Sequence, residues 1–194
     1  MALSFAAASG AAGKARFRVV VTGTLTEAWT ASSAPVVEGA CTRVETTTGV
    51  RRVSFRGTRV IVTGSTIPSF TVRLRGERRR SGSRTTDVSC VEGNDVEHAD
   101  CVATRTKLRG ASISVRPTRV RLSVGRLQLP AETSTCPVPS GRVPPASGAA
   151  NLPKGAPAGY VRFFVRGGID RREQDADGGV RWRIRWKVTF ERVS

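Results

Sequence analysis

Clustered arginines are the residues of this chain whose type and spacing most directly suggest a chemistry. The stretch 73–84, RLRGERRRSGSR, holds six arginines in twelve positions. Guanidinium groups bind carboxylates and phosphates through paired N–H donors, so a cluster of them attracts anions. Gly76 and Gly82, together with the serines, predict a hairpin tip with its arginines in solvent. A solvated loop without a partner is the alternative. The candidate anion contacts in this stretch are Arg75, Arg78, Arg79 and Arg80.

A second set of cations alternates with large apolar residues in Val180–Phe190, which reads VRWRIRWKVTF. The apolar side chains share one parity, and the basic side chains share the other. A period of two predicts a β-strand, because helical neighbours recur every three or four positions. One face of this strand is expected in a core and the other in solvent. The further candidate anion contacts are Arg181, Arg183 and Arg185.

Four cysteines form an even set, which predicts two disulfides and an oxidising compartment. Three pairings are open; we favour Cys90–Cys101, which would close the polar loop 91–100, and Cys41–Cys136. The chain has no CxxC pair and a single histidine, which disfavours zinc. Four buried free thiols in a cytosolic protein are the alternative.

Motifs for catalysis and metal binding do not stand out. The chain has no glycine-rich phosphate loop before a helix, no GxSxG and no HExxH. His98 is the only side chain that normally titrates near neutrality. Asp175, Asp177 and Gly178 resemble a fragment of a calcium loop, but a third ligand and the distal glutamate are missing. We therefore predict a protein that is not an enzyme and has no cofactor and no metal; a two-carboxylate hydrolase is an alternative.

Short alternating segments run along most of the chain and would position these residues. We expect a first strand at 15–26 and a hairpin of 41–47 with 50–56, turning near Thr48 and Gly49. Residues 91–100 and 167–179 are expected to be polar loops. About ten strands without helical periodicity predict an all-β fold, an antiparallel β-sandwich. A closed β-barrel is the alternative, favoured if the terminal hairpin pairs with the first strand.

The chain is expected to form one domain, residues 15–194, with a Pro/Gly-rich loop at 136–157. Residues 1–14 are uncharged up to Lys14 and rich in small side chains, typical of a signal-peptide remnant or a disordered arm. No segment is apolar for long enough to span a membrane.

Trp29 after the first strand, the single Cys41, and the later Cys90 and Asp100-Cys101 form a recognisable layout. This layout resembles that of small, uncharacterised, exported β-rich proteins that contain disulfides and are encoded in GC-rich bacteria. The resemblance covers most of the chain and rests on loose spacing. It implies export and supplies no activity.

The balance of charge narrows the partners. Lysine and arginine number 32 against 15 acidic residues, a net charge of +17. Such an excess attracts anionic polymers. The leading hypothesis is a secreted or cell-envelope β domain, stabilised by disulfides, that binds an anionic envelope polymer or a protein partner. The first alternative is a cytoplasmic nucleic-acid binder that stacks bases on Phe164 or the tryptophans; the second is an envelope hydrolase.

Overall fold

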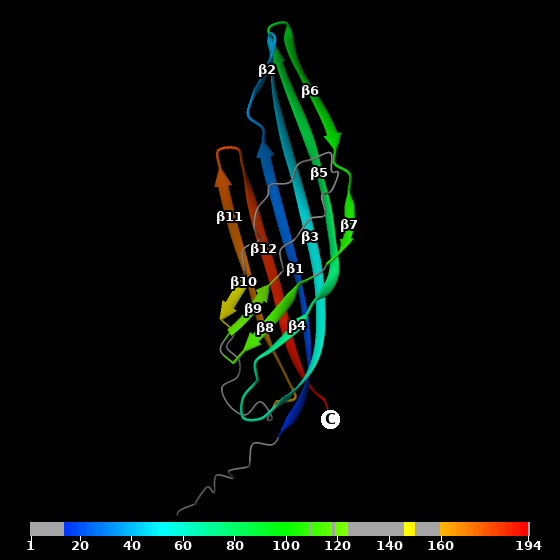
Figure 1. The fold of residues 1–194 in the computed structure, drawn as a ribbon, viewed down its shortest axis with the longest axis vertical. Helices are drawn as coiled ribbons and strands as arrows, with labels where there is room; N and C mark the ends of the chain where they lie inside the picture. The colour runs from blue at the N-terminus through cyan, green and yellow to red at the C-terminus, as the bar shows by residue number, and fades with distance from the viewer. Residues whose placement is uncertain (1–13, 109, 118, 124–145, 150–159, 194) are drawn as a thin grey trace, which may run out of the picture.

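The computed structural model of the chain describes residues 14–108, 110–117, 119–123, 146–149 and 160–193 (Figure 1). These residues form an all-β structure, as predicted. Among them there is no helix with the length and apolar character needed to cross a membrane. The described strands are β1 (Ala15–Ser32), β2 (Val36–Glu38), β3 (Cys41–Thr63), β4 (Phe70–Arg73), β5 (Arg75–Cys90), β6 (Gly93–Asp100), β7 (Thr104–Lys107), β8 (Ser112–Arg116), β9 (Arg119–Ser123), β10 (Ala146–Ala149), β11 (Arg162–Asp175) and β12 (Gly178–Val193).

Eight strands form a large antiparallel sheet. Its hydrogen-bonded order is β11-β12-β1-β3-β5-β6, with β2 paired to β3 and β7 paired to β5. The first strand lies between β3 and the last strand, so that Phe17 opposes Ile61 on one side and Arg192 on the other. The longest strands, β1, β3, β5 and β12, are neighbours in this order, which makes the sheet elongated along the strand direction (Figure 1).

The other four strands form a small antiparallel sheet with the order β10-β9-β8-β4. It covers the lower part of the large sheet in Figure 1, and its strands are inclined to those behind them. The chain passes between the two sheets at Leu74, the single residue between β4 and β5. Two packed antiparallel sheets confirm the predicted sandwich. The terminal strand β12 does pair with β1, yet the large sheet is not a closed barrel, because its edge strands β11 and β6 do not pair with each other.

The hydrophobic core lies between the two sheets. It forms because alternate residues of each strand point to the same face, so apolar side chains at every second position converge on one layer. Each large apolar side chain that is fully buried contributes about 1.5–3 kcal/mol. The predicted core parity of the last strand is confirmed. The core includes Phe17, Val19, Val21 and Leu25 from β1, Val53 and Phe55 from β3, Ile184, Trp186, Val188 and Phe190 from β12, and Phe70, Val72, Ile113 and Val115 from the small sheet.

The predicted hairpin at Thr48 and Gly49 is wrong. Both residues lie inside β3, one continuous strand of 23 residues. Gly49 opposes Trp29 on β1, and a Cβ atom at Gly49 would lie 2.2 Å from the indole ring of Trp29. The glycine is therefore needed for the close approach of an aromatic ring, a known use of glycine in sheets, and not for a turn.

The predicted hairpin tip at 73–84 is also wrong. Nearly all of this stretch belongs to β5, which pairs with β3 from Arg75 to Cys90. Gly76 is part of the extended strand and lies beside β3, opposite Phe55, where a Cβ atom would be 1.9 Å from the Ser54 carbonyl oxygen. Glycine and serine composition suggested a turn, whereas the pairing with a long neighbouring strand keeps the segment straight.

Two predicted loops are mostly strand. Residues 93–100 form β6, which folds back on β5. The segment 167–179 is occupied by the ends of β11 and β12, with only Ala176 and Asp177 between them. The polar composition of these segments indicated that they are exposed to solvent. It did not determine whether their backbones pair with neighbouring strands, which they do. Within the predicted loop 136–157, Ala146–Ala149 forms β10 on the small sheet; the rest of that loop and residues 1–13 lie outside the described residues.

Candidate anion-binding surface

The exposed face of the large sheet gathers most of the described cations, and we name it the cationic outer face. It is the face opposite the core, and register places its side chains on alternating positions of β1, β3, β5, β7, β11 and β12. All of these cations are exposed except Lys187, which is half-buried. The members are Arg16, Arg18, Arg52, Arg56, Arg75, Arg79, Arg105, Lys107, Arg162, Arg166, Arg172, Arg181, Arg183, Arg185 and Lys187.

Two bands of cations flank a track of threonines on β1. At one level Thr26 lies between Arg183 on β12 and Arg52 on β3. Two residues along β1, Thr24 lies between Arg185 and Ser54. Neighbouring strands are about 4.8 Å apart, so the bands on β12 and β3 are separated by about 10 Å. The short threonine side chains of β1 therefore lie between two rows of cations.

The band on the β3 side extends across β5 to β7. Arg52 opposes Arg79, and Arg79 opposes Arg105 on β7, so three guanidinium groups follow one another across three strands. A pocket of about 350 Å³ lies there, and Val50 and Ser81 contribute to its lining together with these arginines. Like charges on directly opposed residues repel one another. This row is therefore a place where a bound anion would lower the electrostatic energy.

Two carboxylates of the outer face, Asp170 and Glu77, are each shared between two arginines. Asp170 accepts hydrogen bonds from Arg181 at 2.9 and 3.0 Å and from Arg183 at 3.2 Å. The hydrogen bonds from Arg181 lower the pKa of Asp170 to about 2, with a smaller contribution from Arg183. The same contact raises the pKa of Arg181. One carboxylate thus serves two guanidinium groups, and the local excess of positive charge remains.

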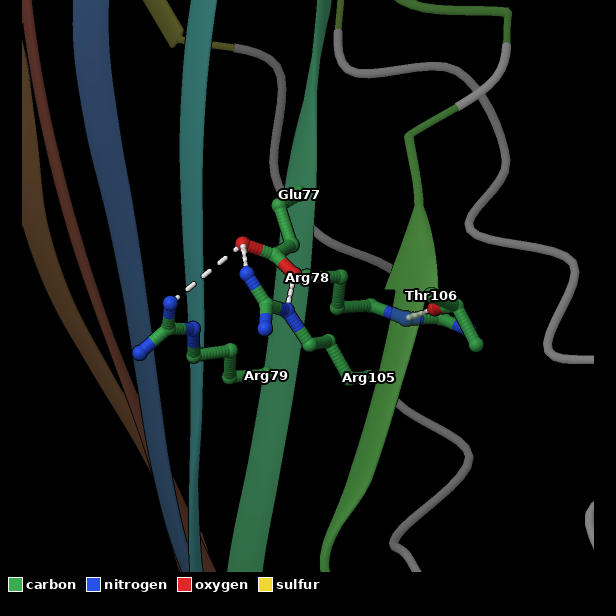
Figure 2. Close-up of polar contacts among 5 residues, drawn as sticks. All are labelled: Glu77, Arg78, Arg79, Arg105 and Thr106. Atoms are coloured by element: carbon green, nitrogen blue, oxygen red, sulfur yellow. Dashed lines mark hydrogen bonds and ion pairs between the residues drawn. The ribbon is translucent and has the colours of Figure 1, made fainter.

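Glu77 has the same role on β5 (Figure 2). Arg105 donates to its Oε2 atom at 2.9 Å, and Arg79 lies 3.4 Å from the same atom. These pairs are solvent-exposed, so each contributes little to stability. Among the described residues, Arg52, Arg56 and Arg185 form no ion pair. The outer face therefore keeps cations that are not neutralised within the described part of the chain.

The seven sequence-predicted arginines divide between the two faces of the sheet. The cationic outer face carries Arg75, Arg79, Arg181, Arg183 and Arg185. Arg78 and Arg80 are instead buried, at 7% and 5% exposure, because residues of one strand alternate between faces. The three consecutive arginines therefore do not crowd together in solvent.

The two buried arginines have partners inside the fold. Arg78 donates from Nε to the Thr106 hydroxyl at 2.9 Å, pointing away from Glu77 (Figure 2). The guanidinium carbon of Arg80 lies 5.5 Å from the centre of the Trp29 ring, within the range of a cation–π contact.

The aromatic side chains considered as base-stacking platforms are differently placed. Trp182 and Trp186 are buried, at 0% and 3% exposure, and belong to the interior as their parity predicted. Phe164 is half exposed on the outer face of β11. Arg166 and Lys187 lie over its ring, 4.6 and 4.7 Å from the centre. The exposed ring thus already carries two cations and adds to the basic surface.

A buried polar cluster lies on the inner face, and sequence reasoning missed it. Glu27 is 1% exposed and accepts hydrogen bonds from Arg51 Nε at 2.5 Å and from Trp182 Nε1 at 3.1 Å. Glu27 and Arg51 also form an ion pair. A signal was present, because Glu27 has the core parity of β1, between Leu25 and Trp29. A charged residue at a core position predicts a buried partner.

The disulfide of the described residues joins Cys41 to Cys90, so both favoured pairings, Cys90–Cys101 and Cys41–Cys136, are wrong. Cys41 and Cys90 are directly opposite on β3 and β5. The segment after Cys90 is strand β6, which carries Cys101 to the level of Gly82, where its N–H donates to the Gly82 carbonyl. At about 3.3 Å per residue, Cys101 lies roughly 25 Å along β5 from Cys90. Cys101 is itself disulfide-bonded; Cys136 lies outside the described residues.

Among the described residues, no group of three or more histidine, cysteine or acidic side chains is arranged to hold a metal ion.

Comparisons with other proteins identified no relative of this chain. Searches against protein-family models, curated proteins and solved structures found no match to this chain.

Proposed function

We propose that this protein is an exported, non-enzymatic β-sandwich module that binds a linear anionic polymer of the cell envelope along its cationic outer face. The observation that carries the proposal is the pair of arginine bands on either side of the threonine track. A flexible chain with a negative charge on each repeat could contact both bands along the strand direction. The buried arginines are not expected to contact the polymer, because their side chains face the interior of the fold.

The geometry favours a chain over a compact partner. Basic side chains recur at every second residue along β12. Successive members of the series Arg181, Arg183 and Arg185 are therefore about 7 Å apart along the strand. The threonine hydroxyls between the bands can donate and accept hydrogen bonds but occupy little volume. A surface of this kind offers many equivalent contacts to a repeating anion and little shape selectivity.

Disulfide bonding supports export. Cys41 and Cys90 are bonded, and Cys101 is also in a disulfide. Structural disulfides persist in oxidising compartments and are rare in the cytosol. The intact mass of protein from its own host, alkylated with and without prior reduction, tests this inference. Four thiols that alkylate only after reduction support export; four thiols that alkylate without reduction would contradict it.

Binding is tested by retention of the full chain on immobilised polyphosphate and polygalacturonate over a series of salt concentrations. Release of several counterions predicts a steep loss of affinity between about 50 and 200 mM salt. The variant Arg52→Gln/Arg185→Gln removes one cation from each band and should elute at distinctly lower salt. A matched control, Arg84→Gln/Arg192→Gln, removes the same charge elsewhere. Equal shifts for both variants, or binding that is insensitive to salt, would contradict the proposal.

Nucleic acid is the other polyanion that the charge could attract, and the same assay separates it. Single-stranded DNA of matched charge is included as a competitor. The envelope proposal expects the DNA to compete no better than the other polymers. Preferential binding of DNA by at least about tenfold, lost in Phe164→Ala, would favour base stacking instead.

A further inference from the structure

A pocket of about 770 Å³ lies where the chain passes from the small sheet to the large one. Its walls are the part of β3 beyond Arg56, where pairing with β5 stops, and the continuous segment formed by β4 and β5. The polar side chains that line it are Arg56, Thr58, Arg59, Thr71, Arg73 and Arg75. It is separate from the pocket in the row of Arg52 and Arg79.

A glycine brings the two walls together. A Cβ atom at Gly57 on β3 would lie 2.5 Å from the Arg73 carbonyl oxygen. Any larger residue would therefore push β4 away from β3. Arg73 and Arg75 from the β4–β5 segment and Arg56 and Arg59 from β3 all line this pocket. One pocket is therefore lined by four arginines.

No carboxylate among the described residues neutralises this site. Arg56 and Arg75 are directly opposite in the β3–β5 register, an arrangement in which like charges repel. The nearest carboxylate on β5 is Glu77, which is bound to Arg79 and Arg105 instead. Arg59 donates to the Thr71 carbonyl oxygen at 2.7 Å, which holds its guanidinium group against β4. None of the four pocket arginines forms an ion pair within the described part of the chain.

We propose that this pocket binds a compact ligand that carries two or more phosphate groups. Guanidinium groups match phosphate oxygens through paired donors, and two threonine hydroxyls add further hydrogen bonds. The volume is that of a small-molecule site and exceeds what a single phosphate fills. Four lining cations without an ion pair balance several negative charges rather than one. This site goes beyond the polymer surface, because Arg59 and Arg73 are not part of the cationic outer face.

Calorimetric titration of the full chain with inorganic tripolyphosphate at about 150 mM salt tests the proposal. One saturable site is expected, with orthophosphate binding at least about tenfold more weakly. The variant Arg59→Gln/Arg73→Gln should lose at least about tenfold in affinity for tripolyphosphate. The matched variant Arg52→Gln/Arg185→Gln removes the same charge from the outer face and should stay within about threefold. Polymer retention should show the opposite ranking, so the two proposals fail separately.

Three results would overturn the site. They are the absence of saturable binding, equal affinities for orthophosphate and tripolyphosphate, and equal losses in the two variants. A measurement on the unaltered protein guards against misfolded variants. Tripolyphosphate should protect Arg56, Arg59, Arg73 and Arg75 from phenylglyoxal, as read by peptide mass spectrometry, while Arg185 stays reactive. Uniform reactivity of all five residues would also overturn the proposal.

Discussion

The two faces of the large sheet each hold a carboxylate between two donors, but in opposite environments. On the inner face Glu27 is buried between Arg51 and Trp182. On the outer face Asp170 is exposed between Arg181 and Arg183. In water the charges are well solvated with or without a partner, whereas a buried charge without a partner is costly. The same chemistry therefore supports the fold on one face and shapes a charged surface on the other.

Breaking the inner pair should have the largest effect. Arg51→Met leaves the Glu27 carboxylate buried without its cation, and we expect a loss of about 3–5 kcal/mol in the free energy of unfolding. Urea denaturation followed by tryptophan fluorescence measures it. Replacing both partners, Glu27→Leu/Arg51→Met, removes both charges and should recover most of the loss. A double variant no more stable than the single one would mean that the cluster does not act through its charges.

The tryptophan that completes the inner cluster gives the next test. Trp182→Ala removes a fully buried ring and the donor to Glu27, and should cost about 3–5 kcal/mol. On the opposite face of the same strand, Arg185→Ala should change stability by no more than about 0.5 kcal/mol. Circular dichroism during thermal unfolding compares the two. A larger loss for Arg185→Ala would reverse the assignment of the faces.

The far end of the sheet, where β6 is exposed along its whole length, should depend on its covalent link. The Cys41–Cys90 bond closes a segment with a sequence separation of 49 residues. Its removal in Cys41→Ala/Cys90→Ala should cost about 2–4 kcal/mol, mostly by increasing the freedom of the unfolded chain. Amide exchange should rise most in β2 and β6. Faster exchange confined to the core strands would argue that this end is held by other contacts.

The outer-face carboxylate of Asp170 should contribute least to stability, and its contribution should depend on pH. The ion pairs with Arg181 and Arg183 hold the pKa of Asp170 in the folded protein at about 2, below its ordinary value of 3.8. Its interaction therefore stabilises the fold above about pH 4 and is lost as the pH falls through about 2. Carboxyl NMR titration should give the low pKa directly. In Asp170→Asn the acid-dependent loss of stability over this range should be smaller, and an unshifted Asp170 titration would contradict the ion-pair geometry.

Alternation along strands was the part of the structure that local sequence predicted well. The core parity of Val180–Phe190 and the exposure of Arg181, Arg183 and Arg185 follow from the period of two alone. The same rule applied to Arg78, Arg79 and Arg80 would have separated them between the two faces. The alternation rule was not applied to this stretch, because Gly76 and Gly82 were interpreted as residues of a turn. Neither glycine has an unusual backbone conformation in the structure.

Strand length and partners could not be predicted, because they depend on residues distant in the chain. In the sequence alone, Gly49 is compatible with a turn. In the structure, the indole ring of Trp29 on β1 lies where a side chain at Gly49 would be. The disulfide likewise depends on which strands become neighbours: β5 lies beside β3, so Cys90 meets Cys41. The candidate pocket joins Arg56 and Arg59 to Arg73 and Arg75 only because the chain changes sheets at Leu74.

By itself, the sequence determined an all-β chain with apolar and cationic faces on alternating residues, since side-chain direction in a strand is a local property. The tertiary structure alone decided which cations share a surface, which are buried with a partner, and which four arginines line one pocket. Those outcomes depend on strand order and register, which are set by long-range pairing and by packing between sheets.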